Sequence, residues 1–184
     1  MIYTFDGDNQ STPLQASSPP FMNVGPGDGP RHITFHPNGQ FAYLINELAG
    51  KVTVFKYKNG DLETKQEVIT HPENYKGIIG SADIHISPDG KFLYASNRGE
   101  ENTITIFSIK KNGKLKLVGF ESTGGKTPRN FVIDPSGKYL LAANQDTDNV
   151  TIFSRNMKTG KLTDTGHGFK IPKPVCLKFG GVLK

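Results

Sequence analysis

The sequence predicts an all-β fold, a β-propeller of about three full four-stranded blades plus partial blades, and two observations carry this prediction. First, a motif recurs at Thr34–Tyr43, His85–Tyr94 and Val132–Leu141, with a period of roughly 50 residues. Second, each repeat contains four short strand candidates separated by turn residues, and no segment has helical spacing longer than a turn or two. A repeated four-stranded unit of this length is typical of a propeller blade.

Two turns recur in every repeat and are interpreted as structural. In the first, a proline suits the second turn position and a glycine closes a type I turn. It occurs as Pro37-Asn38-Gly39, Pro88-Asp89-Gly90 and Pro135-Ser136-Gly137. The second occurs as Lys58-Asn59-Gly60, Lys111-Asn112-Gly113 and Lys158-Thr159-Gly160.

Side-chain alternation predicts what each strand faces. First strands have one apolar face, with Ile33, Ile84, Phe131 and Leu177, and one mixed face, with His32, Asp83, Asn130 and Cys176. Second strands, at residues 41–45, 92–96 and 139–143, are mostly apolar on both faces, as expected between neighbouring sheets. The fourth strands are polar enough to be outer edges. The first strand of each blade is therefore expected to line a central channel.

Strand positions divide the chain into a partial blade (1–24), three blades (25–75, 76–124 and 125–172) and the first strand of a next blade (173–184). The partial blade is expected to supply a third strand, at residues 2–5, and a fourth, at about residues 14–24. Propellers close with about four to eight blades. We therefore expect either a piece of a longer protein or a ring that a second copy completes.

Composition and charge narrow the class of protein. The net charge of +5 is spread through turns, so no nucleic acid partner is indicated, and an anionic small molecule suits it. No apolar run is long enough for a membrane helix, and the first residues lack signal-peptide character. The single cysteine, Cys176, cannot form an internal disulfide and mildly favours a reducing compartment. A cytoplasmic location is expected, with a secreted or periplasmic parent protein left open.

Chain direction predicts one functional rim. The starts of first strands and the ends of second strands meet at the same rim, opposite the proline turns. Asn46, Asn97 and Asn144 recur there in every repeat and are interpreted as structural caps of the following turn. Polar residues that differ between blades are instead candidates for ligand contact. These are Arg31, His32, Asp83, Arg129 and Asn130 from first strands, and Glu47, Arg98 and Gln145 from second strands.

Structural interpretations of the same residues stay open. Arg31 and Arg129 either bind a ligand or bridge carboxylates of adjacent blades. His32 either reacts or is a hydrogen-bonded channel histidine, and Asp83 with His85, on the same strand face, forms either a structural or a catalytic pair. Cys176 is interpreted as a small filler. The five histidines lack zinc-type spacing, so neither a metal nor a cofactor is expected.

An ordered series of motifs resembles the seven-bladed propeller lactonase family of the bacterial 6-phosphogluconolactonase type. The resemblance spans about residues 25–179 and corresponds to the C-terminal half of that family. The motifs are Gly29–His32, Asn46–Leu48, Ala82–Gly90, Tyr94–Gly99, Thr127–Phe131 and Pro174–Cys176. The resemblance implies hydrolysis of 6-phosphogluconolactone to 6-phosphogluconate, in the pentose phosphate pathway, with a small anionic sugar lactone as the partner and no nucleic acid or membrane.

Lactone opening needs an activated water, a donor for the developing oxyanion and an anchor for the phosphate. A base among Glu47, Asp83 and His32, an oxyanion donor in Arg98 and a phosphate anchor in Arg31 with Arg129 would meet these needs. Asn130 and Gln145 would complete substrate binding. Two alternatives remain: a lactonizing isomerase of the muconate cycloisomerase type, because a fungal enzyme of that kind is similar to the same family, and a non-catalytic binding propeller. The charged rim argues against the last, for which exposed aromatic residues are expected.

Overall fold

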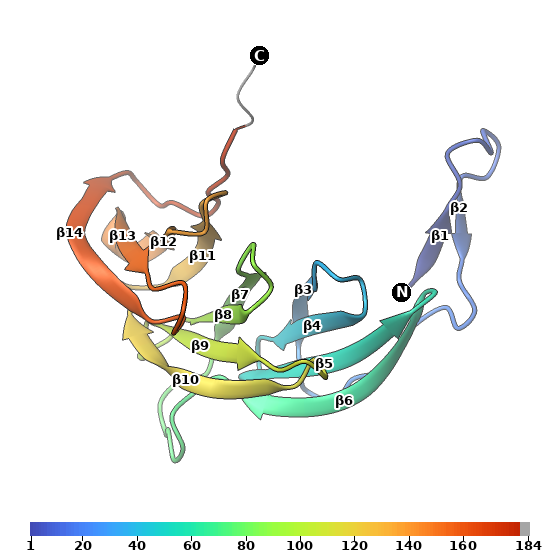
Figure 1. Cartoon of the computed structure of the whole chain (residues 1–184), viewed down its shortest axis with the longest axis horizontal. Coiled ribbons are helices and arrows are strands. Elements are labelled where there is room, and N and C mark those ends of the chain that lie inside the picture. Colours follow the sequence, from blue (N-terminus) through green and yellow to red (C-terminus); the bar gives the residue numbers. More distant parts are fainter. Residues whose placement is uncertain (181–184) are drawn as a thin grey trace.

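The computed structural model describes residues 1–180 and consists of three antiparallel four-stranded sheets and one two-stranded hairpin (Figure 1). One 3-10 turn, η1 (Gln145–Thr147), is the sole helical element among these residues. The predicted all-β propeller fold is confirmed. The first sheet contains β3 (Pro30–Phe35), β4 (Phe41–Asn46), β5 (Lys51–Lys58) and β6 (Asp61–Ile69). The second contains β7 (Ser81–Ile86), β8 (Phe92–Asn97), β9 (Thr103–Ile109) and β10 (Leu115–Ser122), and the third β11 (Pro128–Ile133), β12 (Tyr139–Asn144), β13 (Asn149–Arg155) and β14 (Leu162–Lys170).

The three sheets fan around an open arc with their first strands innermost. Within each sheet the strands pair in chain order, so that β3, β7 and β11 form one edge of their sheets and β6, β10 and β14 the other. Strand β7 packs beside both β3 and β11. Figure 1 shows the long outer strands sweeping along the outside of the arc. The first strands therefore line the channel side, as predicted.

Burial follows the predicted pattern because the second strands lie between sheets. Every residue of β4 and β8 is buried, whereas the outer strand β6 has no fully buried residue. The core between the first two sheets includes Phe41, Tyr43, Ile45, Ile84, Leu93 and Phe107. The core between the second and third includes Phe92, Tyr94, Ile106, Phe131, Leu140 and Phe153.

A repeated lock joins neighbouring blades at the β-turns between their third and fourth strands. The Tyr43 hydroxyl donates to the Gly113 carbonyl at 2.9 Å, and the Tyr94 hydroxyl donates to the Gly160 carbonyl at 2.7 Å. Burial raises the pKa of the Tyr94 phenol to about 12. Each lock spans two blades, so the recurring glycine turns bind sheets together as well as closing hairpins.

The recurring asparagines at the ends of second strands are structural, and Asn46 Nδ2 donates across the following turn to the Lys51 carbonyl at 3.3 Å. The bond that all three share runs to a threonine of the adjacent third strand: Asn46 to Thr53 at 2.9 Å, Asn97 to Thr105 at 2.9 Å and Asn144 to Thr151 at 3.2 Å. Each asparagine is fully buried. A buried amide without access to water needs a protein partner, and the facing threonine hydroxyl provides one.

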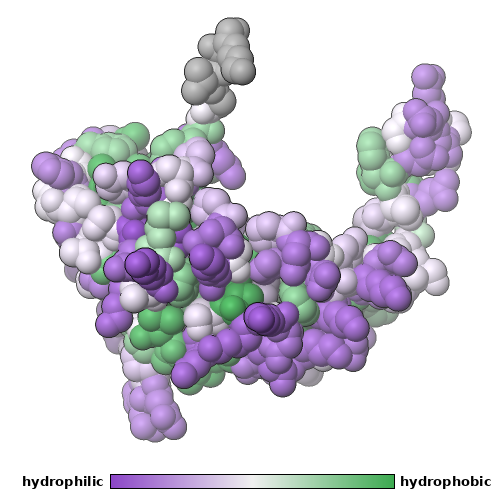
Figure 2. Space-filling model, viewed as in Figure 1, coloured by the Kyte–Doolittle hydropathy of each residue, from purple (hydrophilic) through white to green (hydrophobic). Residues whose placement is uncertain are grey.

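Two faces of the arc are left open among residues 1–180: the first sheet faces only the N-terminal hairpin, across a hollow of about 540 Å³ lined by residues 1–5, Ile33 and Phe35, and the third sheet has no sheet beyond it. Ile33 is 44% exposed, whereas Ile84 at the same position of the next blade is 2% exposed. Tyr139 is 46% exposed, whereas its equivalent Phe92 is 6% exposed. Apolar patches are visible among the polar surface of the space-filling view (Figure 2).

The first residues form a hairpin that stands apart from the first sheet (Figure 1). Its strands, β1 (Tyr3–Phe5) and β2 (Leu14–Ala16), are exposed throughout, and the second is shorter than expected. Residues 17–29 form no strand, although Met22 and Val24 pack against the first sheet. Strand β2 pairs only with the three residues of β1, so no longer ladder forms among the described residues.

Residues 173–180, predicted to begin the first strand of a next blade, form no strand pairs. The second strand with which they would pair is not in this sequence, and residues 181–184 of the predicted strand lie outside the described residues. The segment nevertheless lies against β11, where the Leu177 backbone N–H donates to the Asn130 Oδ1 at 2.6 Å. No helix within residues 1–180 is long and apolar enough to span a membrane.

Candidate active site

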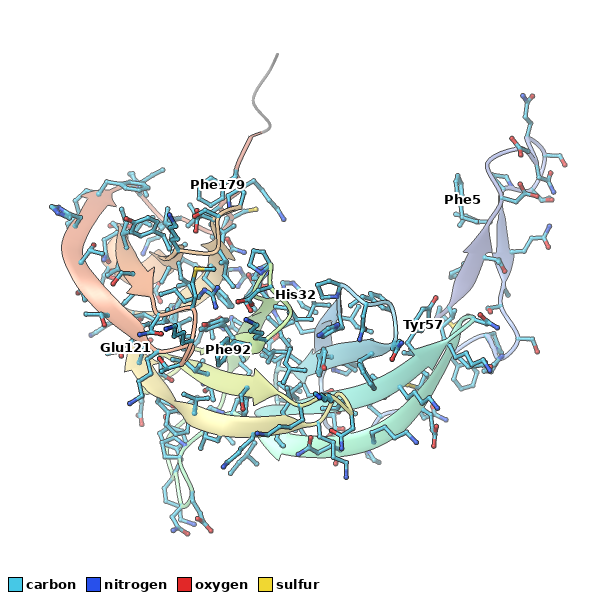
Figure 3. The ribbon with its side chains drawn as sticks, viewed as in Figure 1. Phe5, His32, Tyr57, Phe92, Glu121 and Phe179 are labelled. Carbon is cyan, nitrogen blue, oxygen red and sulfur yellow. The ribbon has the colours of Figure 1, made fainter. Side chains whose placement is uncertain are left out.

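Five of the eight predicted site residues line one pocket of about 370 Å³ on the channel side. They come from the starts of the innermost strands, as the chain-direction argument predicts. His32, labelled in Figure 3, projects from β3 toward β7. The five are Arg31, His32, Asp83, Arg129 and Asn130, and they are joined in the lining by His85, Val175, Cys176 and Lys178, among others.

Asp83 is the centre of the pocket's hydrogen-bond network. Its side chain is 4% exposed, and both carboxylate oxygens accept bonds from more than one donor. Burial alone would raise its pKa, but the bonds from His85, His32 and the Phe131 backbone N–H outweigh burial and hold the pKa well below its ordinary value. Asp83 is therefore a carboxylate at neutral pH. The five donors are His32 Nδ1 (2.8 Å), His85 Nε2 (3.0 Å), Asn130 Nδ2 (2.5 Å) and the backbone N–H groups of Ile84 (3.0 Å) and Phe131 (3.2 Å).

This carboxylate fixes the protonation pattern of two imidazoles. A carboxylate only accepts, so the nitrogens facing Asp83 carry protons: Nδ1 of His32 and Nε2 of His85. In the neutral form of each ring, the opposite nitrogen carries a lone pair. On His32 that nitrogen is Nε2; Nη1 of Arg31 lies beside the ring, 3.2 Å from Nε2 and 3.3 Å from Nδ1, and donates to the Ala82 carbonyl at 2.6 Å. The His85 ring packs edge-on against Phe131, with centroids 4.9 Å apart, which restricts its orientation.

Beside the imidazoles lie the guanidinium groups of Arg31, Arg98 and Arg129, with fewer carboxylates than guanidinium groups around them. Glu47 forms an ion pair with Arg31, whose Nε lies 3.3 Å from its carboxylate, and accepts a hydrogen bond from Arg98 Nη2 of the next blade. Burial lowers the pKa of Arg31, and the positive charges of Arg98 and Arg129 lower it further, although Glu47 opposes this change. Among residues 1–180, Arg129 has no carboxylate within ion-pair distance. The cluster thus has the character of an anion site.

The sequence comparison identifies the family to which this arrangement belongs. The family model described as "Lactonase, 7-bladed beta-propeller" matches residues 1–179. The chain belongs to this seven-bladed propeller lactonase family.

Relatives of this lactonase-family chain include proteins named for lactone hydrolysis. A 6-phosphogluconolactonase from Formosa agariphila is 53% identical over 128 residues, which cover 68% of this chain and 35% of that protein. A crystal structure of a candidate 6-phosphogluconolactonase from Bacteroides fragilis is 46% identical with a TM-score of 0.91, covering 97% of this chain and 51% of the other. The periplasmic gluconolactonase PpgL from Pseudomonas aeruginosa is 36% identical with a TM-score of 0.92, covering 98% and 50%. This chain therefore spans about half the length of the solved lactonase-family structures that it matches.

Three predicted residues of this lactonase-family chain lie outside the pocket lining. Glu47 and Arg98 adjoin it through Arg31. Gln145, in η1, does not line it, and its buried Oε1 has no hydrogen-bond partner among residues 1–180. His85 lines the pocket but was not among the predicted site residues. Its position two residues after Asp83, on the same face of the strand, is the sequence feature that indicates it.

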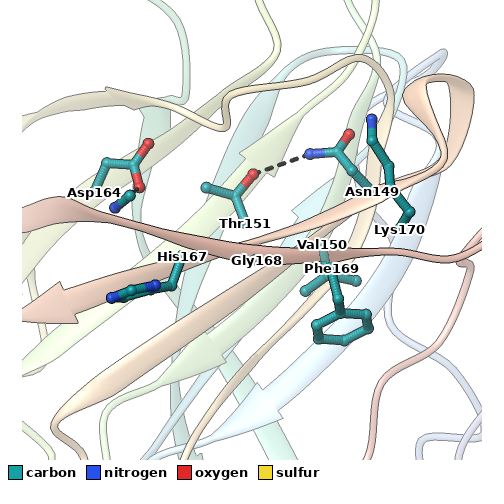
Figure 4. Close-up of a pocket in the computed structure, with 9 residues that line it drawn as sticks. Asn149, Val150, Thr151, Asp164, His167, Gly168, Phe169 and Lys170 are labelled. Atoms are coloured by element: carbon teal, nitrogen blue, oxygen red, sulfur yellow. Dashed lines mark hydrogen bonds between the residues drawn. The ribbon is translucent and has the colours of Figure 1, made fainter.

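A second hollow, of about 390 Å³, lies over the outer strands β13 and β14 and contains none of the predicted residues (Figure 4). There, Asn149 donates to Thr151 at 3.2 Å beside His167 and Phe169. Within residues 1–180, no cluster of three or more histidine, cysteine, aspartate or glutamate side chains is arranged to hold a metal ion.

Proposed function

We propose that this chain carries the lactone-binding half of a lactonase and that its substrate is 6-phosphogluconolactone, hydrolysed to 6-phosphogluconate. The observation that carries the proposal is the Asp83 carboxylate holding two imidazoles in fixed tautomers beside the arginine cluster. Ester hydrolysis requires a base for water and a donor for the oxyanion, and this pocket supplies groups for both.

The imidazoles are better bases than the carboxylates first considered. Asp83 already accepts five hydrogen bonds and has a lowered pKa, so it is a weak base and suits an orienting role. Glu47 is engaged by two guanidinium groups. We assign the activation of water to His32 or His85, each through the nitrogen that faces away from Asp83.

The arginines divide between the oxyanion and the substrate's phosphate. Arg31 lines the pocket, and its Nη1 lies beside the His32 ring and donates to the Ala82 carbonyl at 2.6 Å; we assign stabilisation of the oxyanion to this guanidinium group. Arg98 binds Glu47 outside the pocket lining. We therefore assign it to orienting Glu47, which pairs with Arg31, and not to contacting the oxyanion. Arg129 has no carboxylate partner in the described chain, and a guanidinium in that state suits bidentate binding of phosphate, with Lys178 in the same lining.

The named relatives include both a phosphogluconolactonase and a gluconolactonase, so the phosphate is the feature to test. A pentose phosphate role and a cytoplasmic location accompany the phosphorylated substrate, whereas the Pseudomonas aeruginosa neighbour is periplasmic. Hydrolysis should be measured for 6-phosphogluconolactone and gluconolactone, with this chain alone and with this chain joined to the preceding blades of the Bacteroides fragilis protein. A rate above the spontaneous background is expected for the joined protein.

Arg129→Ala should raise KM for the phosphorylated lactone by a factor equivalent to roughly 1.5–3 kcal/mol and change hydrolysis of gluconolactone little. The reason is that phosphate is bound similarly in the ground and transition states. Lys158→Ala, in an exposed turn, removes a charge elsewhere and serves as the control. Equal losses for both lactones would remove Arg129 from phosphate binding. No hydrolysis, together with interconversion of a muconate and its lactone, would favour the isomerase alternative.

A further inference from the structure

Equivalent positions of successive blades are joined by hydrogen bonds around the channel wall. His32 Nδ1 donates to Asp83 Oδ1, and Asn130 Nδ2 donates to Asp83 Oδ2. Asn130 Oδ1 in turn accepts from the backbone N–H of Leu177. These hydrogen bonds thus connect β3, β7, β11 and the segment 173–180, which are distant from one another in the sequence.

The direction of each bond in this row is determined by its two ends. The Leu177 N–H can only donate, so the oxygen of the Asn130 amide must face it. The NH2 group of that amide then faces Asp83, which can only accept because its pKa is lowered. Both polar atoms of Asn130 therefore have partners within the protein, and these two bonds fix the orientation of the amide.

We propose that Asn130 is a positioning residue, which holds the Asp83 carboxylate toward its two imidazoles and fixes residues 176–178 against the pocket. This inference rests on the proposed function and changes the role of Asn130 from substrate binding to orientation of the groups that react. Cys176 and Lys178, which flank Leu177, line the same pocket. One amide thus connects the orientation of the base with the placement of a lysine beside the anion site.

A second carboxylate beside Asp83 would disturb the hydrogen bonds that orient it. Asp83 has no second carboxylate among its hydrogen-bonding neighbours. Asn130→Asp would place one against Oδ2, where two like charges at this distance repel strongly. The new aspartate would still accept the hydrogen bond from the Leu177 backbone N–H. The charged and titratable groups that share the pocket with Asp83 are His32 and Arg31 from β3, His85 from β7, Arg129 from β11, and Cys176 and Lys178 from the segment 173–180.

The test uses the full 184-residue chain and histidine side-chain nitrogen NMR, together with amide hydrogen exchange. Asn130→Asp should change the imidazole signals of His32 and His85 while Leu177 stays protected. Asn130→Ala should change the same signals and speed exchange at Leu177 by roughly tenfold or more, because its hydrogen bond is lost. Asn156→Asp is the matched control: it adds the same charge in the β13–β14 turn, where the side-chain oxygen already accepts from Lys158 N–H.

Unchanged His32 and His85 signals in both Asn130 variants, or unchanged Leu177 exchange in Asn130→Ala, would overturn the proposal. In the joined protein, a positioning role predicts a kcat at least tenfold lower with KM nearly unchanged, whereas a rise in KM alone would return Asn130 to substrate binding. If wild type hydrolyses no lactone, the proposed function fails, and the NMR and exchange results still decide whether Asn130 positions Asp83.

Discussion

Asp83 organises the candidate site because it is buried, charged and fully hydrogen-bonded. A carboxylate loses hydration on burial, and this cost is offset only when donors surround it. Here the donors come from three successive blades, with His32, His85 and Asn130 supplying the side chains. The same bonds that stabilise the fold therefore orient the proposed bases.

Replacing this carboxylate should change both stability and its pH dependence. The folded-state pKa of Asp83 lies below its ordinary value of 3.8, so the unfolded chain binds the proton more readily. Its stabilising contribution is present above about pH 4 and is lost as the pH falls toward the lower folded-state pKa. Asp83→Asn should lower the free energy of unfolding by roughly 3 kcal/mol at pH 7. Urea denaturation from pH 7 to pH 3 should show a flatter pH dependence in Asp83→Asn than in wild type. Asp61→Asn, exposed at the start of β6, is the control, and an equal slope in wild type and Asp83→Asn would contradict the assignment.

Comparison of the repeats located most of the pocket from sequence, for a physical reason. A residue that the blade requires recurs in each repeat, as Asn97 does, whereas residues of the pocket lining differ between repeats, as His32 and Asp83 do. The bonds between those residues could not be predicted, because they depend on how closely successive first strands approach. Gln145 shows the limit: its position matched that of Glu47, which adjoins the pocket through its ion pair with Arg31, but Gln145 lies in η1 and its Oε1 has no hydrogen-bond partner among residues 1–180.

At the scale of the element, the glycine turns show what local sequence can and cannot specify. Turn chemistry predicted each hairpin correctly, and Gly113 and Gly160 have φ values of +79° and +75°, which glycine adopts without strain. The contact of each turn with an aromatic pair of the preceding blade is tertiary. A Cβ added at Gly113 would lie 2.3 Å from Phe41 Cδ1. The pattern of one hairpin contains no information about that neighbour.

Gly60 and Gly113 form a matched pair for measuring this contact. Both have positive φ, so alanine is strained at both positions, but an added Cβ at Gly60 meets no atom closer than the Ser17 Oγ at 4.0 Å. Gly60→Ala should lower the free energy of unfolding by roughly 1 kcal/mol through backbone strain. Gly113→Ala should cost roughly 2 kcal/mol more, because the turn must also move away from Phe41 and from the Tyr43 hydroxyl. Urea denaturation of both variants gives the difference, and equal losses would show that the turn does not lock the blades.

Across the whole molecule, the two open faces are chemically alike and lie at opposite ends of the arc. Ile33 and Phe35 belong to the first sheet, and Tyr139 belongs to the third. Strand alternation predicted that these side chains point toward another sheet. Sequence alone left open what covers them, because each blade face packs in the same way against any neighbouring blade. The comparison with structures about twice as long offers further blades as one cover, and a second copy is the other.

The chain by itself should therefore associate head to tail, with the first sheet of one copy facing the third sheet of the next. Between neighbouring sheets of this chain, the equivalent faces are buried and exclude water. Where such faces are exposed, their large apolar patches favour association. Light scattering coupled to size-exclusion chromatography should give a mass above 20.1 kDa that rises with concentration. Phe35→Glu and Tyr139→Glu each place a charge on one of the two faces, and each should shift the chain toward the monomer. Leu117→Glu is the control, since Leu117 is 48% exposed on the outer strand β10, away from both faces. A monomeric mass at every concentration, or an equal effect of Leu117→Glu, would show that these faces do not mediate association.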